Sequence, residues 1–366
     1  MTIKSRTCPN EKLSDFSPVT KTSYVQGIKM SIRLLVTLGP SSLNEEVITQ
    51  CDHFGIFVFR INLSHTPLDK VKETIDTIRR YTKTPICLDS EGAQIRNQIM
   101  QNGESYLEKG KEVLIHFEEV LGDAKNLSFT PKGIAREFQI GDVIDIDFHS
   151  VSLQVIEVNR ENCIAKVLES GKVGSCKATE VSREIRLPAI TPKDEQAIEI
   201  GKEMGIQHFA LSFANTQKDV NLFRSKVGSD SYVISKVESR SGVSNLASIT
   251  EKSDAILIDR GDLSRQIPVN KIPFMQRRII STVRTKNKPV FVATNLLESM
   301  VINKMPTRAE VNDVVSTLEM GANGLVLAAE TAIGSYPAEC VEMLRSLAKQ
   351  FERWTPNMSI EELLLN

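Results

Sequence analysis

The sequence lacks any strong charge imbalance and any long apolar run. Its 366 residues carry 45 Lys and Arg against 46 Asp and Glu, a formal net charge of −1. A near-neutral chain has no general attraction for nucleic acid or an anionic membrane, so neither partner is predicted. No stretch approaches the roughly 18 apolar residues of a membrane span, and the N-terminal segment lacks the apolar core of a secretory signal. These absences predict a cytoplasmic protein whose partner is a small molecule.

Paired cysteines are also absent. The six cysteines are scattered along the chain without a Cys-x-x-Cys pair, which argues against a zinc site. A disulfide framework is not expected either, because no secretory leader precedes them. We therefore predict reduced, mostly buried thiols. These residues are Cys8, Cys51, Cys87, Cys163, Cys176 and Cys340.

Short apolar segments alternate with longer segments of helical period through most of the chain, the pattern of a parallel sheet with crossover helices. Eight segments are predicted as strands: 32–39, 56–62, 85–89, 208–213, 232–238, 255–262, 289–294 and 324–330. Eight are predicted as helices: 44–54, 69–81, 193–204, 218–227, 241–252, 272–285, 308–320 and 338–351. Eight of each favour a closed (β/α)8 TIM barrel, because an open doubly wound sheet usually stops at about six strands.

The alternation is interrupted once, between the third and fourth predicted strands. Short segments of near-alternating polarity lie there between Gly or Asn turns, which predicts β-structure. We assign residues 97–187 to a β-rich domain inserted at the catalytic face of the barrel, and interpret it as a lid. The barrel is then formed by residues 31–96 and 188–354. It lies between an N-terminal arm, residues 1–30, and a C-terminal tail, residues 355–366.

Polar side chains stand at the ends of the predicted strands, where a barrel of this type builds its active site. Lys236 and Glu238 end the fifth strand, and Asp262 ends the sixth. Because these strands are neighbours, the carboxylates of Glu238 and Asp262 can meet over one hard cation such as Mg²⁺. Lys236 points to the same side as Glu238 and would offset negative charge on a phosphoryl group or an enolate. The alternative is a purely structural cluster of ion pairs.

Further polar groups surround this predicted metal site. Gly261 and Asp262 follow a strand and open a helix, so their backbone N–H groups could bind a carboxylate or a phosphate. Arg60 has a planar guanidinium suited to the same kind of anion. Four more residues offer oxygen atoms that could bind a second, monovalent cation. An ordinary hydrogen-bond network would explain the same four residues equally well. These four are Asn62, Ser64, Asp89 and Ser90.

At these residues the sequence resembles the pyruvate kinase family, motif by motif and in the same order. The resemblance covers nearly the whole predicted barrel, and implies the family's (β/α)8 fold with an inserted lid domain. The matching motifs are VTLGPSS, RINLSH, LDSEGAQIR, SKVES, DRGDLSRQIP, KPVFVATNLLESM, MPTRAEVNDV and AAETAIGSYPAECV.

The resemblance implies roles for the residues at the predicted metal site. Lys236 matches the lysine that stabilises the phosphoryl group and the enolate during transfer. Glu238 and Asp262 match the ligands of Mg²⁺, for which Mn²⁺ can substitute. Thr294 and the backbone of Gly261 and Asp262 match the groups that hold the pyruvyl carboxylate.

The resemblance also implies a phosphate site, a K⁺ site and a nucleotide site. Arg60 matches a phosphate-binding arginine of the family. The residues that match the K⁺ site are Asn62, Ser64, Asp89 and Ser90. The residues assigned to the nucleotide, ADP in the family, are Pro40, Arg96 and Lys177.

Departures from the family pattern cluster where the nucleotide and the closing lid would lie. Glu91 stands in place of a lysine, and Gln94 replaces a carboxylate associated with K⁺ dependence. Ala328 removes a hydroxyl that could relay a proton, and Asp259 replaces a small residue beside the metal ligands. The chain also ends soon after the last predicted helix. We therefore expect no C-terminal regulatory domain, and a homo-oligomer built through barrel surfaces or the N-terminal arm.

Three functional hypotheses follow. The first is Mg²⁺-dependent phosphoryl transfer between phosphoenolpyruvate and a nucleoside diphosphate, giving pyruvate and the triphosphate. The second keeps the metal and enolate site but acts on phosphoenolpyruvate, pyruvate or a related keto acid with a different acceptor, in a specialised pathway. The third is a metabolite-sensing pseudoenzyme, which would be expected to lose Lys236 or a metal ligand early.

Overall fold

Eight parallel strands close into a barrel in the computed structural model, which describes residues 31–92, 94–147 and 149–365. The predicted (β/α)8 fold is confirmed. The strands, in their order around the barrel, are β1 (Arg33–Leu38), β17 (Gly324–Leu327), β16 (Val290–Ala293), β15 (Ala255–Asp259), β14 (Tyr232–Val237), β13 (His208–Leu211), β3 (Ile86–Asp89) and β2 (Val58–Asn62). The predicted N-terminal arm lies outside the described residues.

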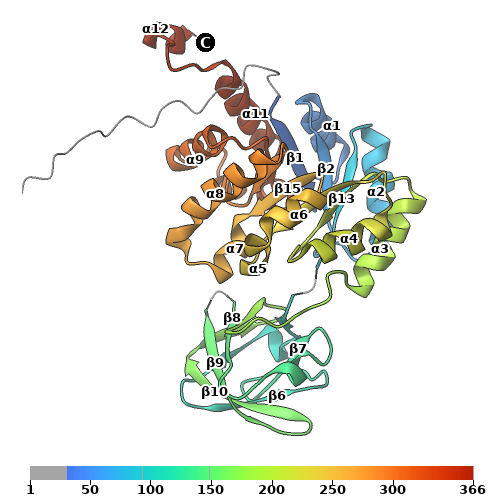
Figure 1. Cartoon of the computed structure of the whole chain (residues 1–366), viewed down its shortest axis with the longest axis vertical. Helices are drawn as coiled ribbons and strands as arrows, with labels where there is room; N and C mark the ends of the chain where they lie inside the picture. The colour runs from blue at the N-terminus through green and yellow to red at the C-terminus, as the bar shows by residue number, and fades with distance from the viewer. Residues whose placement is uncertain (1–30, 93, 148, 366) are drawn as a thin grey trace, which may run out of the picture. The chain divides into compact units, whose positions relative to one another are not determined.

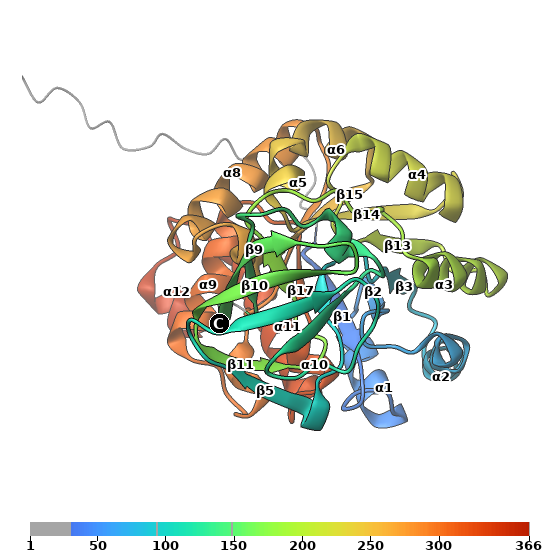
Figure 2. The same ribbon diagram turned by 90° about the horizontal axis from the view of Figure 1, so that it is seen from below.

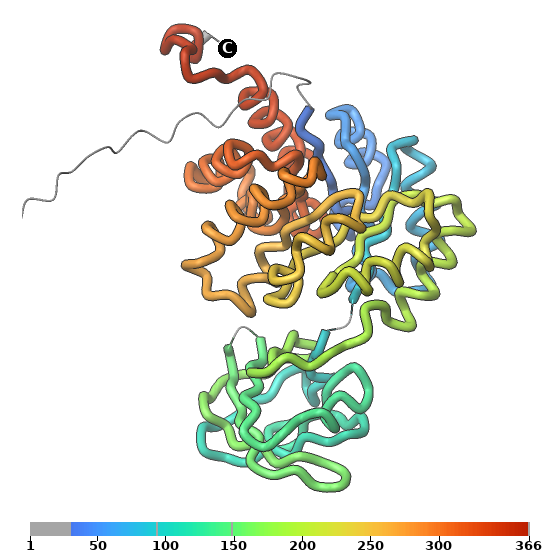
Figure 3. The backbone as a smooth tube through the Cα atoms, viewed as in Figure 1, coloured from blue at the N-terminus to red at the C-terminus, as the bar shows by residue number. Residues whose placement is uncertain are grey.

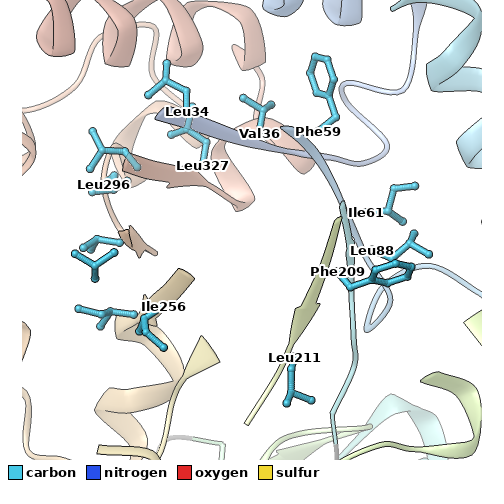
Figure 4. Close-up of a cluster of buried hydrophobic side chains, with 14 of the residues drawn as sticks. Leu34, Val36, Phe59, Ile61, Leu88, Phe209, Leu211, Ile256, Leu296 and Leu327 are labelled. Carbon is cyan, nitrogen blue, oxygen red and sulfur yellow. The ribbon is translucent and has the colours of Figure 1, made fainter. Parts of the chain in front are cut away.

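The barrel strands are apolar on both faces because both faces are buried. Alternate residues of a strand point to opposite sides of the sheet. In β1, Leu34 and Val36 belong to the large cluster between strands and helices, part of which Figure 4 shows. Leu35, between them, belongs to a separate cluster that includes Val58 and Phe291 and fills the barrel interior. This double burial explains the continuous apolar runs in the sequence.

Helices cover the outside of the barrel strands (Figure 1). Three of the longer helices, α3, α4 and α9, begin with a complete capping box. In each, a threonine side chain accepts a hydrogen bond from the backbone amide three residues later; the threonines are Thr191, Thr216 and Thr307. The helices are α1 (Glu45–His53), α2 (Val71–Tyr81), α3 (Pro192–Glu203), α4 (Gln217–Val227), α5 (Arg240–Ser244), α6 (Leu246–Lys252), α7 (Arg260–Gln266), α8 (Ile272–Thr285), α9 (Arg308–Glu319), α10 (Ala329–Ala332), α11 (Pro337–Arg353) and α12 (Ile360–Leu365).

One predicted helix is wrong in detail. The helical period of residues 241–252 predicts a single helix, but the structure divides this segment into α5 and α6 at Asn245. The Asn245 side chain donates to the carbonyl of Asn215, 2.9 Å away in the loop that follows β13. This tertiary hydrogen bond holds Asn245 at the break, which periodicity alone could not indicate.

The segment between β3 and α3 is mainly β, with two short 3-10 helices at Gln101–Gly103 and Ile134–Glu137. It has its own apolar cluster, which includes Leu107, Ile144 and Leu153. Its main sheet has the order β12-β8-β9-β10-β6-β7-β4, and β11 pairs with β5. The strands are β4 (Arg96–Asn97), β5 (Glu104–Leu107), β6 (Glu112–His116), β7 (Asn126–Thr130), β8 (Val143–Ile146), β9 (Val151–Val158), β10 (Asn162–Glu169), β11 (Gly171–Gly174) and β12 (Thr179–Val181). Figure 2 shows the β9 and β10 ribbons, and the tube of Figure 3 traces the chain out of the barrel and back.

Within the described part of the chain, no helix is long and apolar enough to cross a membrane.

Candidate active site

The carboxyl ends of neighbouring barrel strands bring the predicted metal-site residues together. Lys236 lies near the end of β14, and Glu238 follows that strand directly. Asp259 ends β15 and pairs in register with Ala293 of β16, which puts Thr294 beside it. Because strands of a parallel barrel all end on the same side, these side chains share one site.

Lys236 is buried, with 6% of its surface exposed, and contacts acidic side chains from two strands. Its Nζ lies 2.9 Å from Glu238 Oε1 and 3.3 Å from Asp89 Oδ2, and donates to Ser212 Oγ at 3.0 Å. Burial alone would lower the pKa of Lys236, but the charges of Asp89 and Glu238 outweigh it and raise the pKa above its usual value. Lys236 is therefore a fixed positive charge at the centre of the site.

Three carboxylates next to Lys236 are arranged as ligands for a cation. Glu238, Asp259 and Asp262 each offer an oxygen, and these oxygens lie within 4.8 Å of one another. Glu238 Oε2 accepts a hydrogen bond from the Phe213 amide. Among the residues that the structure describes, Oε1 has only its ion pair with Lys236. Burial raises the pKa of Glu238 to about 8, although Lys236 opposes this effect. Burial, followed by the charge of Asp259, also raises the pKa of Asp262.

The carboxylates of this site crowd together despite the cations beside them. The carboxylates are those of Asp89, Glu238, Asp259 and Asp262, and the nearby cations are Arg60, Lys236, Arg265 and Arg96. Burial and the neighbouring carboxylates still raise the pKa values of Glu238 and Asp262, which shows that their charged forms are costly here. A divalent cation would lower this cost. The residues therefore fit Mg²⁺ or Mn²⁺, which bind oxygen ligands, better than they fit a purely structural ion-pair cluster.

Asp259 contacts two groups beside the predicted metal ligands. Its Oδ1 accepts hydrogen bonds from the Thr294 hydroxyl, at 2.5 Å, and from the Gly261 amide, at 3.2 Å. Burial would raise the pKa of Asp259, but the Lys236 charge and the Thr294 hydrogen bond lower it overall. Asp259 therefore contacts the same Thr294 and Gly261 groups that we predicted to hold a substrate carboxylate.

Arg60 is almost fully buried and contacts Asp89, the carboxylate that also pairs with Lys236. Its Nη1 pairs with Asp89 Oδ2 at 2.8 Å, and its Nε donates to Thr37 Oγ1 at 2.8 Å. Asp89 thus bridges Arg60 and Lys236. The guanidinium is held firmly in place, so any anion that it binds is positioned relative to Lys236.

The four residues predicted for a monovalent cation take part in separate hydrogen bonds and ion pairs in the structure. The backbone amide of Ser64 donates to Asn62 Oδ1 at 3.0 Å. The Ser212 amide donates to Ser90 Oγ at 2.9 Å, while Asp89 is engaged by two cations. These contacts are those of the alternative explanation, and the K⁺ site stays a prediction.

The residues predicted for the nucleotide are held by separate contacts. Arg96, on β4, donates to Gln94 Oε1 at 2.7 Å and to the Cys176 carbonyl at 3.1 Å. Its charge weakly opposes the burial that raises the pKa of Asp262. Lys177 pairs with Asp147 at 3.2 Å. Pro40 is exposed in the turn after β1. The structure thus brings Arg96 near the carboxylate cluster, and the nucleotide site stays a prediction.

Arg260 is a residue of the site that sequence reasoning did not select. Its Nη2 donates to the carbonyls of Thr294, at 2.6 Å, and Asn295, at 3.1 Å, and its Nη1 pairs with Asp313 at 2.6 Å. Thr294 and Asn295 both have positive φ, which residues with a Cβ adopt rarely. Arg260 therefore holds the loop that presents the Thr294 hydroxyl. A charged side chain directly after a strand was the only signal in the sequence.

Replacing Arg260 with lysine is expected to lower the free energy of unfolding by about 1–3 kcal/mol, because an ammonium cannot reproduce the forked hydrogen bonds. Urea denaturation measures this change. The control is Arg277→Lys on α8, since Arg277 donates to a carbonyl of its own helix from an exposed position. Equal stability of the Arg260→Lys and Arg277→Lys proteins would contradict the anchoring role.

Most of this chain is similar in sequence to proteins of one known family. The family profile described as the pyruvate kinase barrel domain matches residues 29–341. A pyruvate kinase of Bacillus licheniformis is 33% identical over 332 residues, which is 87% of this chain and 57% of that protein. One of Clostridium perfringens is 34% identical over 331 residues, 87% of this chain and 70% of that protein. This chain thus spans less than two thirds of the Bacillus protein.

The fold is also similar to that of a solved pyruvate kinase structure. The crystal structure of a pyruvate kinase from Cryptosporidium parvum superposes with a TM-score of 0.80 at 31% sequence identity. The superposition covers 89% of this chain and 70% of the crystallised chain. Both the sequence profile and the superposition therefore extend well beyond the local motifs.

Proposed function

Because this chain belongs to the pyruvate kinase family, we propose that it transfers a phosphoryl group between phosphoenolpyruvate and a nucleoside diphosphate, giving pyruvate and the triphosphate. The observation that carries the proposal is the arrangement of Lys236, Glu238 and Asp262. Lys236 Nζ lies 2.9 Å from Glu238, and an oxygen of Asp262 lies within 4.8 Å of one of Glu238. A fixed cation beside an oxygen-ligand cluster suits a reaction in which negative charge moves between a phosphoryl group and an enolate.

Each part of the site has a role in the proposed reaction. Glu238 and Asp262 would hold Mg²⁺ or Mn²⁺, which when bound supplies positive charge to the phosphoryl and enolate oxygens. Lys236 offsets charge on the same oxygens from the protein side. Arg60 orients the phosphate through its guanidinium, which Asp89 holds in place. The Thr294 hydroxyl and the Gly261 amide are the donors for the substrate carboxylate.

The remaining features of the proposal concern the acceptor and the assembly. The nucleoside diphosphate, ADP or another acceptor, would contact Arg96, Lys177 and the Pro40 turn. We propose that residues 97–187 form the lid over this site. A K⁺ ion would bind at Asn62, Ser64, Asp89 and Ser90. A homo-oligomer in the cytoplasm completes the proposal.

The test follows phosphate and pyruvate by NMR in a mixture of protein, Mg²⁺, K⁺ and phosphoenolpyruvate, with and without each nucleoside diphosphate. We expect pyruvate to form together with the nucleoside triphosphate. Consumption without a nucleotide, or only with another cosubstrate, would instead support an enzyme with a different acceptor. Thermal stabilisation by phosphoenolpyruvate without any turnover would support a metabolite sensor.

A further inference from the structure

The carboxylate of Asp259 occupies the donors that the proposed reaction needs for its substrate. The Thr294 hydroxyl has one proton, and it is donated to Asp259 Oδ1 at 2.5 Å. The Gly261 amide also has one proton, donated to the same oxygen at 3.2 Å. Two donors from different strand ends therefore converge on a side chain of the protein itself.

The space around the Thr294 hydroxyl and the Gly261 amide is also filled. A Cβ placed on Gly261 would lie 2.9 Å from Thr294 Cγ2 and 3.4 Å from Asp259 Oδ1. Gly261, Thr294 and Asp259 are thus packed together closely. A second carboxylate on the same donors would have to displace the Asp259 side chain, because each proton is already committed and two adjacent carboxylates repel each other.

We propose that Asp259 is a specificity-determining residue that competes with a substrate carboxylate for Thr294 and Gly261. This inference rests on the proposed function, in which the substrate is a carboxylate beside a transferable phosphate. A carboxylate-bearing ligand binds only after Asp259 has left these donors, and this requirement weakens its binding. A phosphate group, which is oriented by Arg60 and Lys236, does not depend on the same donors.

Asp259 could weaken carboxylate binding either by occupying the hydrogen-bond donors or by repelling the ligand with its charge. Two replacements of Asp259 distinguish these explanations. Asp259→Ala removes both the charge and the acceptor. Asp259→Asn removes the charge but retains a carbonyl oxygen that Thr294 and Gly261 can still bind. If donor occupation matters, the alanine variant must gain more affinity for carboxylates than the asparagine variant. If only charge matters, both variants gain equally.

The experiment measures binding by calorimetry at a Mg²⁺ concentration that saturates each protein, because Asp259 is also one of the three clustered carboxylates. The probes are phosphoenolpyruvate, oxalate and inorganic phosphate. We expect Asp259→Ala to bind phosphoenolpyruvate and oxalate at least about 10-fold more tightly than the unmodified protein. The affinity of Asp259→Asn for these two probes rises less, but it is still higher than that of the unmodified protein. The affinity for inorganic phosphate changes by the same factor in both variants, because phosphate binding responds to the lost charge alone.

Thr294→Val supplies an independent measurement. In the Asp259→Ala background this replacement removes a donor that is free for the substrate, so oxalate affinity falls more than in the unmodified background. Thermal unfolding in each case identifies a variant that has not folded. Were Asp259→Ala unfolded, Asp259→Asn would still decide, because an amide oxygen is a weaker acceptor than a carboxylate. A gain in oxalate affinity no larger than the gain in inorganic phosphate affinity would then overturn the proposal.

Several results would overturn the proposal, and they differ from failure of the proposed function. Equal carboxylate affinity in the unmodified and Asp259→Ala proteins, with phosphoenolpyruvate turned over by both, overturns only the role of Asp259. Equal gains in Asp259→Ala and Asp259→Asn overturn donor occupation as well. Absence of phosphoenolpyruvate binding in all three proteins overturns both the role of Asp259 and the proposed function.

Discussion

Replacing Lys236 with methionine is expected to reduce pyruvate formation by at least about 1,000-fold, because a positive charge in contact with the transferring group supplies several kcal/mol of transition-state stabilisation. Methionine approximates the length and volume of the lysine stem, so the change removes mainly charge. Initial rates at saturating phosphoenolpyruvate and nucleoside diphosphate measure the effect. Unchanged turnover in this variant would rule out the proposed mechanism.

Loss of folding must be separated from loss of catalysis in this variant. Lys236 pairs with Asp89 and Glu238 in a buried site, so its removal is also expected to lower stability by about 3–5 kcal/mol. Lys236→Arg keeps the charge and should retain more stability, while its larger planar head misplaces that charge for catalysis. Lys286→Met is the surface control, because Lys286 forms an exposed ion pair with Glu251. Its activity should equal that of the unmodified protein.

Replacing Glu238 with glutamine is expected to weaken Mn²⁺ binding by at least about 100-fold, because an anionic ligand of the cluster becomes a neutral amide. The amide oxygen can still accept the hydrogen bond from Phe213, so local structure should persist. Asp262→Asn should act in the same direction. Titration of free Mn²⁺ by electron paramagnetic resonance measures the affinity without any substrate.

The matched control for this prediction is Glu251→Gln. Glu251 pairs with Lys286 on the surface and lies outside the carboxylate cluster. Its replacement should leave Mn²⁺ affinity unchanged. If Glu238→Gln bound Mn²⁺ as tightly as Glu251→Gln does, Glu238 would not be a metal ligand, and the cluster would be a structural ion-pair network.

The barrel and the centre of its site follow from the sequence alone. Strands buried on both faces must be apolar throughout, and surface helices must be amphipathic, so both leave a periodic signal that needs no tertiary information. Lys236 and Glu238 share one side of β14 because strand residues two apart always do. Glu238 and Asp262 follow consecutive strands of the chain, and consecutive strands of a (β/α)8 barrel are neighbours.

The groups that these side chains contact were decided by the tertiary fold. Asp259 and Thr294 are 35 residues apart in the chain, and Arg260 and Asp313 are 53 apart. Such pairs form because barrel closure places the ends of different strands side by side, and the sequence carries no periodic signal for a contact between two single residues. The sequence therefore identified Asp259 as a departure from the family. Its hydrogen bonds to Thr294 and Gly261 depend on the folded positions of two adjacent strand ends.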